Sequence, residues 1–180
     1  LTVNVRPITL TAKPQTKTHG DELNLDNLDA DTYADDPFTI ADNGVSGDST
    51  LPNGEAINKV LFDSITNKNT STVAAADTYL NEIQITSISD SSISASNYNI
   101  TYVPGDLTIA PRAITLTASD QSKIYGDALS LGNTAFTTLD KDGDSVLPNG
   151  ELVDTVTLVS ANGVDASTDS DVGTYADNIS

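Results

Sequence analysis

The sequence predicts an all-β fold: two tandem antiparallel, sandwich-like domains arranged end to end. Three observations lead to this prediction. Apolar and β-branched residues alternate with polar residues at period two, as in half-buried strands. Clusters of Gly, Asn, Asp and Pro separate these stretches, as turns do. Finally, several stretches of the 180-residue chain occur twice.

The duplicated stretches appear in the same order in both copies. Their first residues pair as follows: Ile8 with Ile114 (ITLTA), Gly47 with Gly143 (GDS, then LPNGE), and Thr78 with Thr174 (TY). The first pair is offset by 106 residues and the other two by 96, which places about ten extra residues between Asp21 and Gly47. A repeat of this length is a domain with its own core, because a solenoid turn is much shorter.

Period-two alternation predicts the individual strands. They cover residues 8–12, 83–86, 97–102, 107–109, 114–118 and 155–158. Helical spacing occurs only in two short windows, residues 23–28 and 55–62, so we expect little helix.

The repeat also sets the expected domain boundaries. Residues 1–8 align with residues 107–114, so residues 1–6 read as the last strand of a preceding repeat. The first repeat domain then covers residues 7–111 and the second residues 112–180. The second domain has no counterpart of residues 85–106, so we expect it to be truncated at its C-terminal strands. The missing strands either belong to residues outside the 180-residue segment or are supplied by a neighbouring chain. Pro111 stiffens a very short linker.

Composition excludes several classes of protein. The chain has 26 acidic and 8 basic residues, a formal net charge of −18. This argues against nucleic acid and anionic membranes as partners, and it favours solubility and affinity for cations. The chain has no cysteine, which excludes disulfides, thiolate metal sites and a thiol nucleophile. Its apolar runs are too short for membrane insertion.

Five sequence blocks suggest a family. The second copy contains PRAITLTA (111–118), KIYGD (123–127), GDS (143–145) and VGTY (172–175), and the first adds ASNYNITY (95–102) with GDLTI (105–109). In this order they resemble the tandem MBG/YDG-type repeats of very large bacterial surface adhesins, over nearly the whole chain. The first copy departs at His19, where Tyr is usual, and at Ala76, which precedes Asp77-Thr78-Tyr79 without the family's Gly.

The resemblance implies a non-enzymatic, extracellular stalk or spacer repeat on the bacterial cell surface, supporting adhesion or a biofilm matrix. It supplies no binding residues. Expected partners are neighbouring repeats, copies of the chain itself, or surface glycans. Two alternatives stay open: a calcium-assisted glycan-binding module, and a self-assembling fibre subunit in which residues 1–5 pair with the second domain of another copy.

The best candidate for a metal site is the acidic stretch of residues 140–151. Asp140, Asp142, Asp144 and Glu151 fall at positions 1, 3, 5 and 12, the ligand spacing of an EF-hand Ca²⁺ loop. Ser145 stands where such a loop has Gly, and the flanks read as strands. The stretch is therefore either a calcium site or a solvated acidic turn. In the first copy the matching positions hold, by the 96-residue offset, Gly44, Ser46, Asp48 and Glu55.

The remaining candidates favour structural roles. The acidic stretches 26–36 and 165–171 are possible cation sites that read better as surface loops. Tyr79 and Tyr175 resemble the tyrosine corner of Greek-key sandwiches, in which the hydroxyl bonds back to the backbone. The single histidine, His19, has no nucleophile motif near it, so a catalytic triad finds no support and we expect no enzyme activity.

Overall fold

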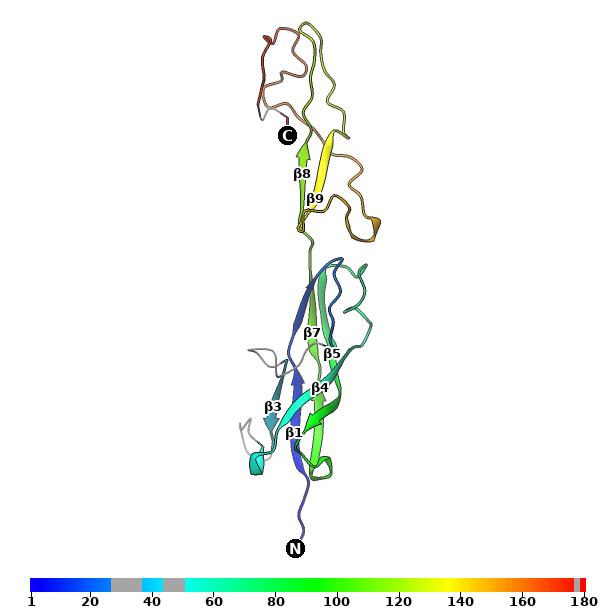
Figure 1. Cartoon of the computed structure of the whole chain (residues 1–180), viewed down its shortest axis with the longest axis vertical. Coiled ribbons are helices and arrows are strands. Elements are labelled where there is room, and N and C mark those ends of the chain that lie inside the picture. Colours follow the sequence, from blue (N-terminus) through cyan, green and yellow to red (C-terminus); the bar gives the residue numbers. More distant parts are fainter. Residues whose placement is uncertain (27–36, 44–50, 177–178) are drawn as a thin grey trace. The chain divides into compact units, whose positions relative to one another are not determined.

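The computed structural model describes residues 1–26, 37–43, 51–176 and 179–180. These residues form β-strands and three short 3-10 turns and contain no α-helix, which confirms an all-β chain (Figure 1). The chain divides into two compact units, unit 1 (Leu1–Pro111) and unit 2 (Arg112–Ser180).

Unit 1 contains two sheets. The three-stranded sheet has the order β3 (Phe38–Asp42), β1 (Arg6–Ala12), β6 (Tyr98–Val103). The four-stranded sheet has the order β2 (Gln15–Thr18), β7 (Gly105–Ala110), β5 (Asp77–Ser91), β4 (Ile57–Ser64). Both sheets supply side chains to one buried cluster, whose fully covered members are Ile8, Leu10, Ile83, Leu107 and Ile109. The period-two pattern of β1 thus places its apolar residues in this core.

The expectation of purely antiparallel sheets is wrong for two strand pairs. β1 pairs with β6 in parallel, and β2 pairs with β7 in parallel. The reason is that β1 continues into β2, and β6 into β7, across short connections that change from one sheet to the other. The connection from β1 to β2 and the connection from β6 to β7 lie side by side, since a Cβ on Gly105 would stand 2.5 Å from the carbonyl oxygen of Ala12. Glycine is therefore required there.

Within its described residues, unit 2 has one regular strand pair, in which β8 (Ile114–Ala118) runs antiparallel to β9 (Phe136–Asp140) (Figure 1). The pair has the register of β1 with β3, since Ile8 faces Asp42 and Ile114 faces Asp140. A single bridge joins Ser160 to Ile179.

Unit 2 also repeats the finer geometry of unit 1. The bridge matches the β4–β5 pairing of Ser64 with Ile83. The LPNGE stretches both form a 3-10 turn, Pro52–Gly54 and Pro148–Gly150, with positive φ at the central Asn (61° and 59°). These features recur at the offset of 96.

Some expected elements differ from the structure. Residues 55–62 belong largely to β4 rather than to a helix, and residues 155–158 are in no strand. Residues 23–28 form no helix over their described part, which ends at Asp26. Residues 1–5 are in no strand either, so their assignment to a preceding repeat stays a prediction.

The two ITLTA strands differ most in burial. Leu10 is 0% exposed in unit 1, whereas Leu116 is 43% exposed in unit 2. Identical sequence thus lies on a covered face in one unit and on an open face in the other.

Candidate functional site

Asp140 ends β9 and is enclosed by donors. Its Oδ2 accepts hydrogen bonds from Nε (2.9 Å) and Nη2 (2.7 Å) of Arg112, and its Oδ1 accepts the backbone N–H groups of Asp142 (2.8 Å) and Asp144 (3.0 Å). The side chain is 1% exposed. The hydrogen bonds from Arg112, assisted by the two backbone donors, lower the pKa of Asp140 to about 2. This carboxylate therefore serves as the partner of Arg112.

The other acids of the predicted calcium loop are not gathered around a common centre. Asp142 forms ion pairs with Arg112 (2.6 Å) and Lys141 (2.9 Å). Glu151 follows the 3-10 turn and donates its backbone N–H to Pro148. Across the described residues, no three or more His, Cys, Asp or Glu side chains form a group able to hold a metal ion. The Arg112 guanidinium lies where a cation would contact Asp140 and Asp142, and calcium binding stays a prediction.

The first unit repeats the arginine–aspartate pair. Arg6 donates from Nε (2.7 Å) and Nη2 (2.5 Å) to Oδ2 of Asp42. Asp42, rather than Gly44, is thus the structural counterpart of Asp140, which corrects the 96-residue alignment at this point. The reason is strand register: Asp42 and Asp140 both end the strand that faces ITLTA. The other expected counterparts, Ser46 and Asp48, lie outside the described residues with Gly44.

Glu55, the last of those counterparts, accepts a hydrogen bond from the hydroxyl of Tyr98 in β6. Burial and this bond raise the pKa of Tyr98 to about 12. Glu55 therefore fastens the turn of residues 52–54 to the three-stranded sheet.

A buried lysine forms the most distinctive arrangement of unit 1. Lys17 in β2 is 8% exposed, and its Nζ donates to the carbonyl oxygens of Asp21 (3.2 Å), Asn69 (3.1 Å) and Ser71 (2.8 Å). Burial lowers the pKa of Lys17, and the charges of Glu22 and Asp21 oppose this shift. The ammonium group has three donor protons and three carbonyl acceptors, so the lysine links β2 to the loop after β4 through hydrogen bonds.

Unit 2 contains a similar arrangement, with two of the three carbonyl partners at equivalent positions. Nζ of Lys123 donates to the carbonyl oxygens of Val164, Asp165 (3.4 Å) and Ser167. Asp165 begins the third acidic candidate stretch, and its main chain, rather than its carboxylate, makes this contact. The sequence did not predict these carbonyl contacts, although the two lysines recur at the same offset of 106 as ITLTA.

Glu82 shapes the loop that Lys17 holds. It is 4% exposed and accepts hydrogen bonds from the Ser64 hydroxyl and from both the N–H and the hydroxyl of Thr66 (2.9 Å each). Burial opposes ionisation of Glu82, but these hydrogen bonds outweigh it and lower its pKa. The carboxylate is thus satisfied within the loop after β4.

The tyrosine and histidine contacts are structural. The hydroxyl of Tyr79 donates to the carbonyl of Ala75 (3.0 Å), and that of Tyr175 to the carbonyl of Asp171 (2.8 Å), which confirms the predicted tyrosine corners. Nδ1 of His19 donates a hydrogen bond to the carbonyl oxygen of Ala74 (2.8 Å).

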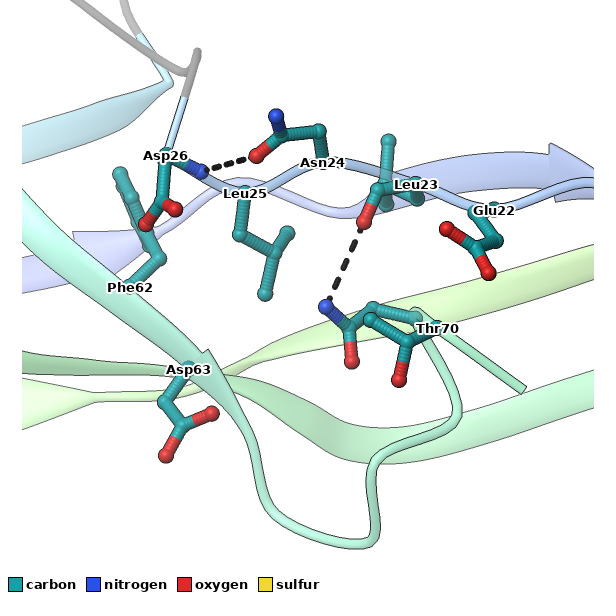
Figure 2. A pocket seen from close by; sticks show the side chains of 9 residues that line it. Glu22, Leu23, Asn24, Leu25, Asp26, Phe62, Asp63 and Thr70 are labelled. Atoms are coloured by element: carbon teal, nitrogen blue, oxygen red, sulfur yellow. Dashed lines mark hydrogen bonds between the residues drawn. The ribbon is translucent and has the colours of Figure 1, made fainter.

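An open pocket of about 230 Å³ lies beside the loop after β4, shown in Figure 2. Leu25 points into it, and Asn69 donates from Nδ2 to the carbonyl of Leu23 (3.3 Å). The lining residues are Glu22, Leu23, Asn24, Leu25, Asp26, Phe62, Asp63, Asn69 and Thr70. The pocket is smaller than the roughly 300–1,000 Å³ cavities that hold small-molecule ligands. Of the acidic stretch 26–36, only Asp26 lies among the described residues.

The comparisons with protein-family models, curated proteins and solved structures give no match to the chain. Of the residues whose positions are described, none belongs to a helix with the length and apolarity needed to cross a membrane.

Proposed function

We propose that this chain is a non-enzymatic stalk or spacer segment of an extracellular bacterial surface protein. It resembles the MBG/YDG-type repeats of adhesins, which support adhesion or a biofilm matrix. In this proposal each unit corresponds to one sandwich-like repeat, the second truncated at its C-terminal strands, and the repeats follow one another along the chain through Pro111. Their partners are neighbouring repeats or further copies of the chain.

One observation carries this proposal: in both units, equivalent charged and polar side chains that could serve chemistry form hydrogen bonds and ion pairs that hold the fold. Each unit has an arginine–aspartate pair at the end of the strand facing ITLTA. Each also has a lysine ammonium bonded to loop carbonyls and a tyrosine hydroxyl bonded to the backbone. A pattern of this kind is expected where a repeat is selected for its own stability and for stacking with its neighbours.

Small-angle X-ray scattering of the full chain tests the arrangement. A compact 180-residue globule has a radius of gyration of about 16 Å. Two domains in line should give a clearly larger value, extrapolated to zero concentration. A radius near 16 Å would contradict the proposal.

A glycan array, read with and without millimolar Ca²⁺, tests the function. A spacer gives no hits in either condition, whereas calcium-dependent hits would establish the alternative of a calcium-assisted glycan-binding module. Loss of hits after Asp144→Asn, which keeps the pair of Arg112 with Asp140, would then assign the binding to the acidic loop.

A further inference from the structure

The strand β6 (Tyr98–Val103) forms an open edge of the three-stranded sheet of unit 1. It pairs with β1 on one side, and no strand of the described residues pairs with it on the other. Among the described loops and turns, none donates to or accepts from the main chain of β6. Alternate residues of a strand direct their N–H and C=O groups to opposite sides. Every second residue of β6 therefore presents both groups away from β1, where they can pair with another strand.

The other edge strands described in unit 1 carry features that discourage pairing between molecules. Such features are short length and charged side chains. β2 has four residues, and one of them is the buried Lys17. β3 ends at the buried Asp42, and β4 carries Lys59 and Asp63. By contrast, β6 has six residues and no charged side chain.

β6 also lies within the longest uncharged run of the sequence. Residues 91–105 contain no Asp, Glu, Lys or Arg, in a chain with 26 acidic and 8 basic residues. The strand keeps a regular alternation of its two faces. Tyr98 and Ile100 pack against the core, whereas Asn99 and Thr101 are exposed. The edge is thus an ordered strand with open main-chain groups and no charge to repel a partner strand.

We infer that β6 of one copy pairs with β6 of a second copy, antiparallel, across this open edge. The two three-stranded sheets then form one continuous sheet of order β3-β1-β6-β6-β1-β3. Inward side chains must stay on the core side, so the two-fold axis passes through Ile100 or Thr101. Tyr102, which is 39% exposed, then lies opposite Tyr98 of the second copy in the first register, or opposite its Ile100 in the second.

The charge of the chain favours a second copy as the occupant. Each copy carries a net charge of −18, so two copies repel each other wherever acidic loops approach. Pairing through β6 brings two uncharged strands together, and they match in length and in the alternation of their faces. The contact uses the same surface on both copies, so it closes as a dimer. Added NaCl should strengthen the dimer by screening the remaining repulsion.

This contact lies beyond the proposed spacer function and does not depend on it. A stalk or spacer needs contacts along the chain, whereas β6 joins two separate chains. Main-chain hydrogen bonds supply the affinity, as in other additions of a strand to a sheet edge.

Disulfide cross-linking of the full chain tests the pairing directly, because the sequence contains no cysteine. Residues opposite each other in an antiparallel pair have Cα atoms about 4.5–5.5 Å apart, within the range that a disulfide spans. If the axis passes through Thr101, T101C alone should form a covalent dimer under mild oxidant. If it passes through Ile100, T101C mixed with N99C should do so. T39C is the matched control, since Thr39 is an exposed threonine on β3, at the opposite edge of the same sheet.

Sedimentation across a protein and NaCl series gives a second, independent readout. Thr101→Asp places a carboxylate on the edge and should weaken dimer formation severalfold. Thr39→Asp adds the same charge at the opposite edge and should not weaken it beyond this general repulsion. Urea unfolding of both variants checks that unit 1 stays folded, and Asn99→Asp replaces Thr101→Asp if it does not.

Cross-linking of T101C, alone or with N99C, that is severalfold faster than that of T39C would support the pairing. Equal rates, equal effects of the two Asp variants, or a monomer under all conditions would overturn it. A monomer is also the result expected if the edge receives a strand of another protein. None of these results bears on the spacer proposal, which scattering and glycan binding test separately.

Discussion

The duplicated ITLTA strand allows one substitution to be made in two environments. Leu10→Ala removes a side chain that is 0% exposed and packed between two sheets, and Leu116→Ala removes one that is 43% exposed. Burial and cavity terms make the first cost about 2–5 kcal/mol in the free energy of unfolding. The second leaves little cavity and loses only part of the burial energy, so it should cost about 1 kcal/mol.

Hydrogen exchange followed by mass spectrometry across a urea series resolves the two units in one sample. Peptides from residues 57–64 and 83–91 report on unit 1, and peptides from residues 114–140 report on unit 2. The measurement is made at low micromolar concentration, which limits association between copies. Equal destabilisation by the two substitutions would refute the argument, because it would mean that the face of β8 is covered as fully as that of β1.

Three further predictions concern the charged groups. Lys17→Met should destabilise unit 1 by about 1–3 kcal/mol in urea unfolding, because it leaves loop carbonyls without a donor, whereas Lys13→Met in the adjacent connection should have little effect. The pKa of Asp140 is about 2 in the folded chain against an ordinary value of 3.8, so the stability it supplies is present above pH 4 and is lost as the pH falls toward 2. The free energy of unfolding of unit 2, measured in urea, should fall over this pH range, and Asp140→Asn should weaken this pH dependence. The same pH dependence in the variant would contradict the pairing of Asp140 with Arg112. The predicted calcium site at Asp140, Asp142, Asp144 and Glu151 implies a higher Tm in millimolar Ca²⁺ than in chelator, with the ion displacing Arg112 from Asp140; an unchanged Tm would contradict it.

The acidic stretch of residues 140–151 shows why residue spacing alone is weak evidence for a metal site. The intervals between Asp140, Asp142, Asp144 and Glu151 match a calcium loop, but spacing along the chain says nothing about Arg112, 28 residues before Asp140. Pairing of β8 with β9 brings the guanidinium to the carboxylate. The same pairing in unit 1 shows that Asp42 is the counterpart, which the sequence alignment missed because the loops differ in length.

The sequence by itself determined the β class, the duplication and most of the strands, because period-two alternation and turn residues are local signals. It also predicted the tyrosine corners, since their geometry spans only four residues. The tertiary structure decided the parallel pairing of β1 with β6 and of β2 with β7, and the partners of Lys17 and Arg112. These depend on contacts between distant segments. Burial was decided in the same way: ITLTA is one sequence, and only the strands packed against it make Leu10 a core residue and leave Leu116 exposed.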